Sequence, residues 1–75
     1  MMHLGSAKWN GELYAQDRRA AGYVAQEVCD IAGISTKTLN LYEHNRIVPD
    51  VEVASMLADA LGYEVTRYID WVAFG

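Results

Sequence analysis

The centre of the chain, residues 25–45, contains two short helix-like segments separated by a glycine and a serine. Small and apolar residues recur at helical spacing from about Ala25 to Ala32, which predicts the first helix. Gly33 can take a positive φ at little steric cost, so we expect the first helix to stop there. Ser35 is a good N-cap and predicts a second helix that starts at Thr36. The segment therefore predicts two helices joined by a tight turn.

Such a pair is a helix-turn-helix unit, and its second helix has an inner and an outer face. Leu39 and Tyr42 lie three residues apart and form the inner face. The outer face is mainly polar and holds Thr36, Lys37, Asn40, Leu41 and His44. In a DNA-binding helix-turn-helix, the N-terminal part of this face enters the major groove. An ordinary solvated helix shows similar residues, and for any single residue that interpretation is favoured. The complete pattern favours DNA recognition.

Side-chain chemistry assigns provisional roles on this face. Lys37 suits guanine, Asn40 suits adenine or a phosphate, and the methyl groups of Leu41 suit a thymine methyl. We expect base contacts from Thr36, Lys37, Asn40 and Leu41, and phosphate contacts from Ser35, Thr38, His44 and Arg46.

The overall charge is the main objection to a nucleic-acid partner. The chain has a formal net charge of −4, whereas phosphate binding needs local positive charge. Lys37, His44 and Arg46 lie on or just after the second helix of the pair, and Arg18 and Arg19 precede the pair. This distribution predicts a modestly basic face on an acidic body.

Several other classes of protein are disfavoured. No apolar run approaches the length of a membrane span, and the first residues lack the apolar segment of a signal peptide. The single cysteine, Cys29, cannot form an internal disulfide, which fits a reducing cytoplasm. Cys29, His3 and His44 have no paired spacing, so we expect no metal site and no cofactor. No nucleophile, base and orienting group are recognisable together, so we expect no enzyme.

The remainder of the 75 residues predicts one all-α domain. Residues 1–11 show no clear period and are interpreted as an N-terminal extension of a single domain at 12–75. We expect helices at 12–21 and 51–61, the second of them capped by Asp50. Residues 65–72 also fit a helix, with a terminal strand as the less favoured alternative. The prediction is a five-helix bundle with the helix-turn-helix at 25–45.

Several short motifs resemble those of the lambda-repressor-like (XRE) helix-turn-helix family over about Tyr14–Ile69. They are Arg-Arg-Ala-Ala-Gly at 18–22, Ala-Gly-Ile-Ser at 32–35, Tyr-Glu at 42–43 and Leu-Ala-Asp-Ala-Leu-Gly at 57–62. The resemblance implies a five-helix lambda-repressor-like DNA-binding bundle. It also implies a structural clamp, because an arginine near the end of the family's first helix often pairs with a glutamate ending the third. The corresponding residues here are Arg18 and Glu43.

The central segment also resembles the opening of the MerR helix-turn-helix. MerR proteins begin almost directly with this motif and continue into a wing, whereas this chain has a preceding helix and no such wing after Pro49. The XRE resemblance is therefore preferred. Three positions depart from the XRE pattern. Val24 and Ala25 replace the family's usual Thr-Gln pair, which caps the first helix of the helix-turn-helix and contacts a phosphate. Leu41 is apolar at an outward position that is more often polar, and Asn45 replaces a frequent glycine.

Two functions follow from this interpretation. The first is a sequence-specific transcriptional regulator of the small repressor type that binds a pseudo-palindromic operator in double-stranded DNA as a homodimer. The second is a protein-interaction module on the same fold, such as an antitoxin that neutralises a toxin. The acidic charge and the aromatic C-terminus motivate the second function. Tyr68, Trp71 and Phe74 are its expected interface, and homodimerisation is the simplest use of that interface.

Overall fold

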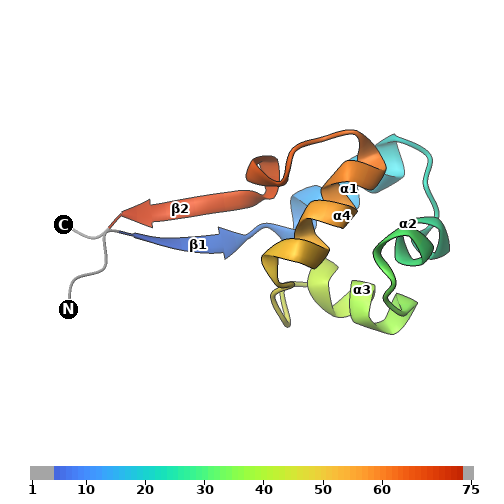
Figure 1. Ribbon diagram of the computed structural model, residues 1–75, viewed down its shortest axis with the longest axis horizontal. Helices are drawn as coiled ribbons and strands as arrows, with labels where there is room; N and C mark the ends of the chain where they lie inside the picture. Colours follow the sequence, from blue (N-terminus) through green and yellow to red (C-terminus); the bar gives the residue numbers. More distant parts are fainter. Residues whose placement is uncertain (1–4, 74–75) are drawn as a thin grey trace.

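The structure is a computed structural model that describes residues 5–73. Four α-helices form a body at one end, and two strands leave it as a ribbon (Figure 1). The overall dimensions are 41 × 20 × 19 Å, with the ribbon along the longest axis. The elements are β1 (Gly5–Trp9), α1 (Gly11–Ala20), α2 (Ala25–Ala32), α3 (Thr36–Glu43), α4 (Val51–Leu61), a 3₁₀ turn η1 (Val65–Tyr68) and β2 (Ile69–Ala73).

The bounds of α2 and α4 and the start of α3 are those that the sequence predicts, because local signals determine them. Gly33 ends α2 with a φ of 71°. The Ser35 hydroxyl accepts a hydrogen bond from the Thr38 amide at 3.1 Å, which caps α3. The carboxylate of Asp50 accepts from the amide of Val53 at 2.9 Å and caps α4 in the same way.

The core lies where the four helices meet, and two tyrosines from opposite ends of the chain are fully buried in it. The ring centroids of Tyr14 and Tyr68 are 5.2 Å apart in an edge-to-face arrangement. The Tyr14 hydroxyl donates to the carbonyl of Leu57 at 2.7 Å and so links α1 to α4. Burial raises the pKa of both tyrosines and of the thiol of Cys29, which is fully buried.

The predicted fifth helix at residues 65–72 is wrong. Val65–Tyr68 forms one 3₁₀ turn, and Ile69–Ala73 forms the strand β2. β2 pairs antiparallel with β1, in a register that runs from Trp9 opposite Ile69 to Gly5 opposite Ala73. A local pattern cannot reveal this partner because it lies at the other end of the sequence. The β-branched and aromatic residues of this segment suit a strand once a partner is present.

The described residues that precede the predicted domain start at residue 12 also form regular structure. Residues 5–9 form β1, and α1 begins at Gly11, one residue before the predicted start. The side chain of Trp9 is buried against the body.

Tyr68 does not belong to an exposed interface, which corrects the prediction for this residue. Its side chain is fully buried, and its hydroxyl donates to the carboxylate of Asp17 at 2.7 Å. Tyr68 is therefore part of the domain's own core. Trp71 lies in β2 opposite Ala7, and Phe74 lies outside the described residues.

Within residues 5–73 no helix combines the length and the apolarity that a membrane crossing requires. In the same part of the chain, no three His, Cys, Asp or Glu side chains are grouped so that they could hold a metal ion.

Candidate nucleic-acid interface

A buried ion pair between Arg18 and Glu43 fixes the position of α3 on α1. Arg18 Nε donates to Glu43 Oε2 at 2.8 Å, and Arg18 Nη2 donates to Glu43 Oε1 at 3.2 Å. The two side chains are only 12% and 7% exposed. The pair raises the pKa of Arg18, mainly through its hydrogen bonds to the Glu43 carboxylate. Arg18 Nη1 also donates to the carbonyl of Tyr23 at 2.9 Å, so one guanidinium links α1, the α1–α2 loop and α3.

A second set of contacts holds the C-terminal end of α3 against the β1–α1 junction. Trp9 Nε1 donates to the carbonyl of Tyr42 at 2.9 Å, and the amide of Gly11 donates to Asn45 Oδ1 at 2.9 Å. A Cβ atom at Gly11 would lie 2.0 Å from the Tyr42 carbonyl oxygen, so the approach requires glycine. Asn45 has a φ of 57°, in the left-handed region that asparagine tolerates better than most residues. Its amide side chain caps α1, which glycine could not do.

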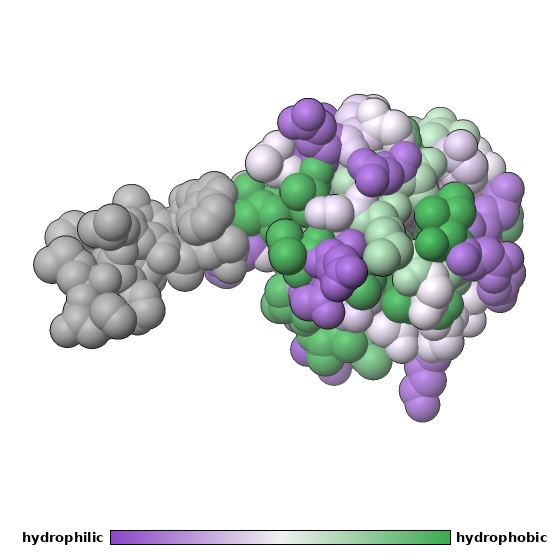
Figure 2. Space-filling model, viewed as in Figure 1, coloured by the Kyte–Doolittle hydropathy of each residue, from purple (hydrophilic) through white to green (hydrophobic). Residues whose placement is uncertain are grey.

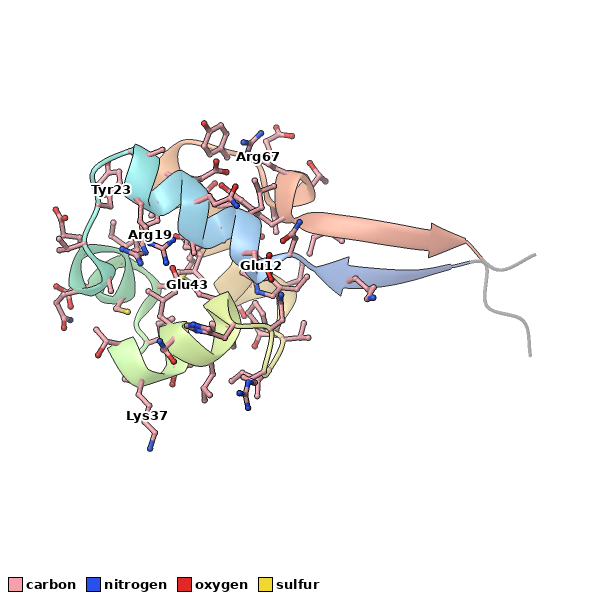
Figure 3. All side chains as sticks on the ribbon, turned by 180° about the vertical axis from the view of Figure 1, so that it is seen from behind. Glu12, Arg19, Tyr23, Lys37, Glu43 and Arg67 are labelled. Atoms are coloured by element: carbon pink, nitrogen blue, oxygen red, sulfur yellow. The ribbon has the colours of Figure 1, made fainter. Side chains whose placement is uncertain are left out.

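With its inner side fixed, α3 presents its other side to solvent. Thr36, Lys37 and Asn40 are exposed, and Leu41 is half-buried. Figure 3 shows the Lys37 side chain extending away from the body at the start of α3. The four residues expected to contact bases therefore lie on a helix whose position and rotation are held by polar contacts at its C-terminal end.

A groove of about 430 Å³ runs beside this face, between the C-terminal end of α1, the start of α2 and α3. Thr36, Lys37, Asn40 and His44 contribute from α3, and Arg19 contributes from α1. Arg19 is exposed, and Figure 3 shows it on α1 beside the clamp. Arg18 also lines the groove, but its guanidinium is held by Glu43, whereas the side chain of Arg19 is exposed. Arg18 and Arg19 are consecutive in α1, so their side chains point in different directions, and the pairing of Arg18 with Glu43 leaves Arg19 on another side of the helix.

The hydroxyls of Ser35 and Thr38, both expected at phosphates, are hydrogen-bonded to each other. Ser35 Oγ accepts from the Thr38 amide and donates to Thr38 Oγ1 at 3.0 Å. The single proton of Ser35 is therefore already used, whereas the Thr38 hydroxyl keeps its proton to donate. In this geometry Thr38 is the better of the two phosphate donors.

His44 and Arg46 lie exposed at the end of α3 and in the loop after it. His44 Nδ1 is 2.8 Å from the carbonyl oxygen of Asn40, and because a carbonyl only accepts, Nδ1 carries the proton. The outward nitrogen, Nε2, can then donate to a phosphate only when the ring is doubly protonated. The Arg46 guanidinium has no such restriction.

The basic side chains are distributed unevenly over the body. In the part of the chain that the structure describes, ion pairs engage Arg18 with Glu43 and Arg67 with Asp17. Arg19 and Lys37 border the groove beside α3, Arg46 lies in the loop that follows α3, and all three are exposed. Half of the six Lys and Arg residues are therefore gathered near one helix of an acidic protein.

The fold, the capped α2–α3 pair and the exposed polar face of α3 agree with a comparison with known families. A family model described as helix-turn-helix (HTH_3) matches residues 15–67, which is most of the chain. The chain belongs to the XRE family of helix-turn-helix proteins.

Among solved structures, the XRE chain is similar to one described as a complex of SinR protein and SinI protein. The TM-score is 0.69 at 24% sequence identity, so the likeness shows the fold. The match covers 76% of this chain and 56% of that chain, so this XRE domain spans little more than half of its structural relative. No curated protein matches the sequence.

Proposed function

We propose that this protein is a sequence-specific transcriptional regulator of the small repressor type that binds a pseudo-palindromic operator as a homodimer. In this arrangement α3 of each subunit lies in successive major grooves, roughly 34 Å apart. The observation that carries the proposal is the exposed polar face of α3, whose inner side is fixed by the buried Arg18–Glu43 pair. The single cysteine forms no internal disulfide and is buried, which suits a reducing compartment, and we place the protein in the cytoplasm.

The proposal divides the residues around α3 into two groups. Thr36, Lys37, Asn40 and Leu41 contact base edges in the major groove. Arg19, Arg46, Thr38 and, when its ring is protonated, His44 contact phosphates on either side of the groove, with Ser35 acting chiefly as the cap of α3.

The two groups are distinguished by substituting one member of each. Lys37→Ala should relax the preference among bases, because a lysine in the major groove discriminates through base-edge acceptors. Arg46→Ala should weaken binding to all sequences alike and reduce the slope of log K against log salt by about 1. Lys8→Ala is the matched control, since it removes an exposed cation in β1, away from α3. Fluorescence anisotropy with matched and mismatched duplexes at several salt concentrations measures both effects. An equal loss on all sequences from both variants would contradict the assigned roles.

A second candidate function is a protein-interaction module on the same fold, such as an antitoxin with a toxin as its partner. The net charge of −4 supports it, and the similar solved structure is a complex of two proteins. Val24, at the N-cap position of α2, offers no side-chain acceptor, and the amide of Val24 is instead bound by the side chain of Glu27 at 2.9 Å. A carboxylate therefore stands at the start of α2, near the place where a phosphate would approach. The two functions separate in a DNA-binding experiment, because the interaction module needs no duplex.

A further inference from the structure

We propose that His44 couples DNA binding to protonation, so that its imidazole takes up a proton when the outer side of α3 meets a phosphate. The inference rests on the DNA-binding function proposed above and assigns a form of regulation to the same site.

The imidazole of His44 is folded back onto the end of α3. His44 is the C-cap of this helix, and both its backbone amide, at 3.0 Å, and its ring atom Nδ1, at 2.8 Å, contact the carbonyl oxygen of Asn40. Because a carbonyl oxygen only accepts, the neutral ring keeps its proton on Nδ1 and leaves a lone pair on Nε2. At its outer nitrogen the neutral ring therefore offers a phosphate oxygen an acceptor and no donor.

His44 lies on the same side of α3 as the residues that would contact DNA. It lines the groove of about 430 Å³ together with Thr36 and Asn40, at the four-residue spacing of one helix face. In Figure 2 hydrophilic residues project from the lower edge of the body, where Figure 1 shows α3. His44 and Arg19 also border a second hollow of about 180 Å³ between α1 and α3. Both side chains are exposed, so a phosphate at this edge of the groove would meet both of them.

Charges of both signs surround the ring. The carbonyl groups at the C-terminal end of α3 place a partial negative charge beside it. Glu12 of α1 and Glu43 of α3 line the same small hollow, and the carboxylate of Glu43 is bound by Arg18. The positive groups on the elements around His44 are Arg19 of α1, Lys37 of α3 and Arg46 of the following loop.

A bound phosphate changes this balance of charge. It lies among the cations and so removes part of their repulsion for a further positive charge on the ring. Imidazole is the side chain whose charge ordinarily changes between pH 5 and 8. Protonation turns Nε2 into a donor and allows a charge-assisted hydrogen bond to the phosphate. By linkage, a phosphate that binds the protonated ring more tightly also increases the affinity of the ring for a proton. The affinity for DNA should therefore rise as the pH falls through this range.

The test is the affinity of the full chain for a mixed-sequence duplex, because a phosphate contact does not depend on the base sequence. Fluorescence anisotropy measures it at about pH 5.5 and about pH 7.5, at one ionic strength, on either side of the range in which imidazole titrates. His44→Ala removes the ring, and His44→Lys replaces it with a fixed positive charge. The matched controls are Arg19→Ala, which removes a cation that does not titrate in this range, and His3→Asn, which removes the other histidine of the chain. Circular dichroism establishes that each variant keeps its helices.

The wild type should bind at least about fivefold more tightly at the lower pH, the effect of gaining one charged hydrogen bond. His44→Ala should bind weakly and His44→Lys tightly at both pH values, whereas both controls should keep the dependence on pH. Equal affinity of the wild type at the two pH values would overturn the proposal, and so would a dependence that His44→Ala retains. Absence of binding at both pH values would overturn the DNA-binding function as well, so the two failures are distinguishable.

A second measurement needs no DNA. Proton–nitrogen correlation NMR spectra of the free chain should show the neutral ring of His44 with its proton on Nδ1, as the contact with Asn40 requires. A proton on Nε2 would overturn the proposal, because the neutral ring could then donate to a phosphate.

Discussion

The helical body and the ribbon are held by different kinds of interaction. Hydrogen bonds from β1 and α1 converge on α3 and the residue pair that follows it. Arg18 donates to Glu43, Trp9 donates to the carbonyl of Tyr42, and the amide of Gly11 donates to Asn45. The ribbon beyond Trp9 is held by the backbone pairing of its two strands. The difference indicates that side-chain contacts specify the position of α3, whereas the strand register specifies the ribbon.

Removal of the clamp should have the largest effect on the body. Arg18→Met leaves the buried carboxylate of Glu43 without a partner and should lower the free energy of unfolding by about 3–5 kcal/mol. For a chain of this size the melting temperature should then fall by more than about 10 °C. Arg19→Met is the matched control, because Arg19 is exposed and the change should cost less than about 0.5 kcal/mol. Thermal denaturation followed by circular dichroism measures both. Equal melting temperatures for Arg18→Met and the wild type would mean that the pair does not hold α3.

The close approach at Gly11 tests the second attachment of α3. Gly11→Ala inserts a methyl group 2.0 Å from the Tyr42 carbonyl oxygen, so the backbone must move. We expect a loss of about 3 kcal/mol, the upper end for an overpacked site. Glu12→Ala is the control, since Glu12 is exposed in the same turn of α1. If urea denaturation gave both variants the same midpoint, the junction would be looser than the geometry indicates.

A smaller, pH-dependent effect should come from Asp17, which joins α1 to the 3₁₀ turn that leads into the ribbon. Hydrogen bonds from Arg67, at 2.6 and 3.0 Å, hold the pKa of Asp17 below its usual value of 3.8, with help from the Tyr68 hydroxyl. Because the folded state lowers this pKa, the carboxylate's contribution to stability is complete above about pH 4 and is lost as the pH falls further. Asp17→Asn should flatten that part of the curve of unfolding free energy against pH, and the exposed Asp59→Asn should not. If Asp17→Asn left the dependence of unfolding free energy on pH unchanged, the contact between Asp17 and Arg67 would not contribute to stability.

The same two regions show what the sequence was able to predict. Gly33, Ser35 and Asp50 act within a few residues of themselves, so the limits of α2, the start of α3 and both limits of α4 were predictable. β2 was not predictable, because its partner β1 is at the far end of the chain and a run such as Ile69–Ala73 fits a helix equally well in isolation.

The candidate site divides in a similar way. The residues on the outer face of α3 can be predicted from helical spacing, and the family resemblance predicts the ion pair between Arg18 and Glu43. The role of Asn45 as a cap for α1 and the position of Arg19 beside the groove depend on how α1 packs against α3. Tyr68 was assigned to an interface because aromatic residues are enriched at interfaces, but its hydroxyl finds a partner in Asp17 and the ring is buried.

The central claim is that the outer face of α3 reads a DNA sequence, and its most direct test is enrichment of random duplex DNA on the full chain. Salt at about 100–150 mM suppresses capture by charge alone. The account predicts an inverted repeat with half-sites one helical turn apart and a loss of that preference in Lys37→Ala. Absence of any enriched sequence from a folded, dimeric protein would contradict the account, and the partner would then be a protein.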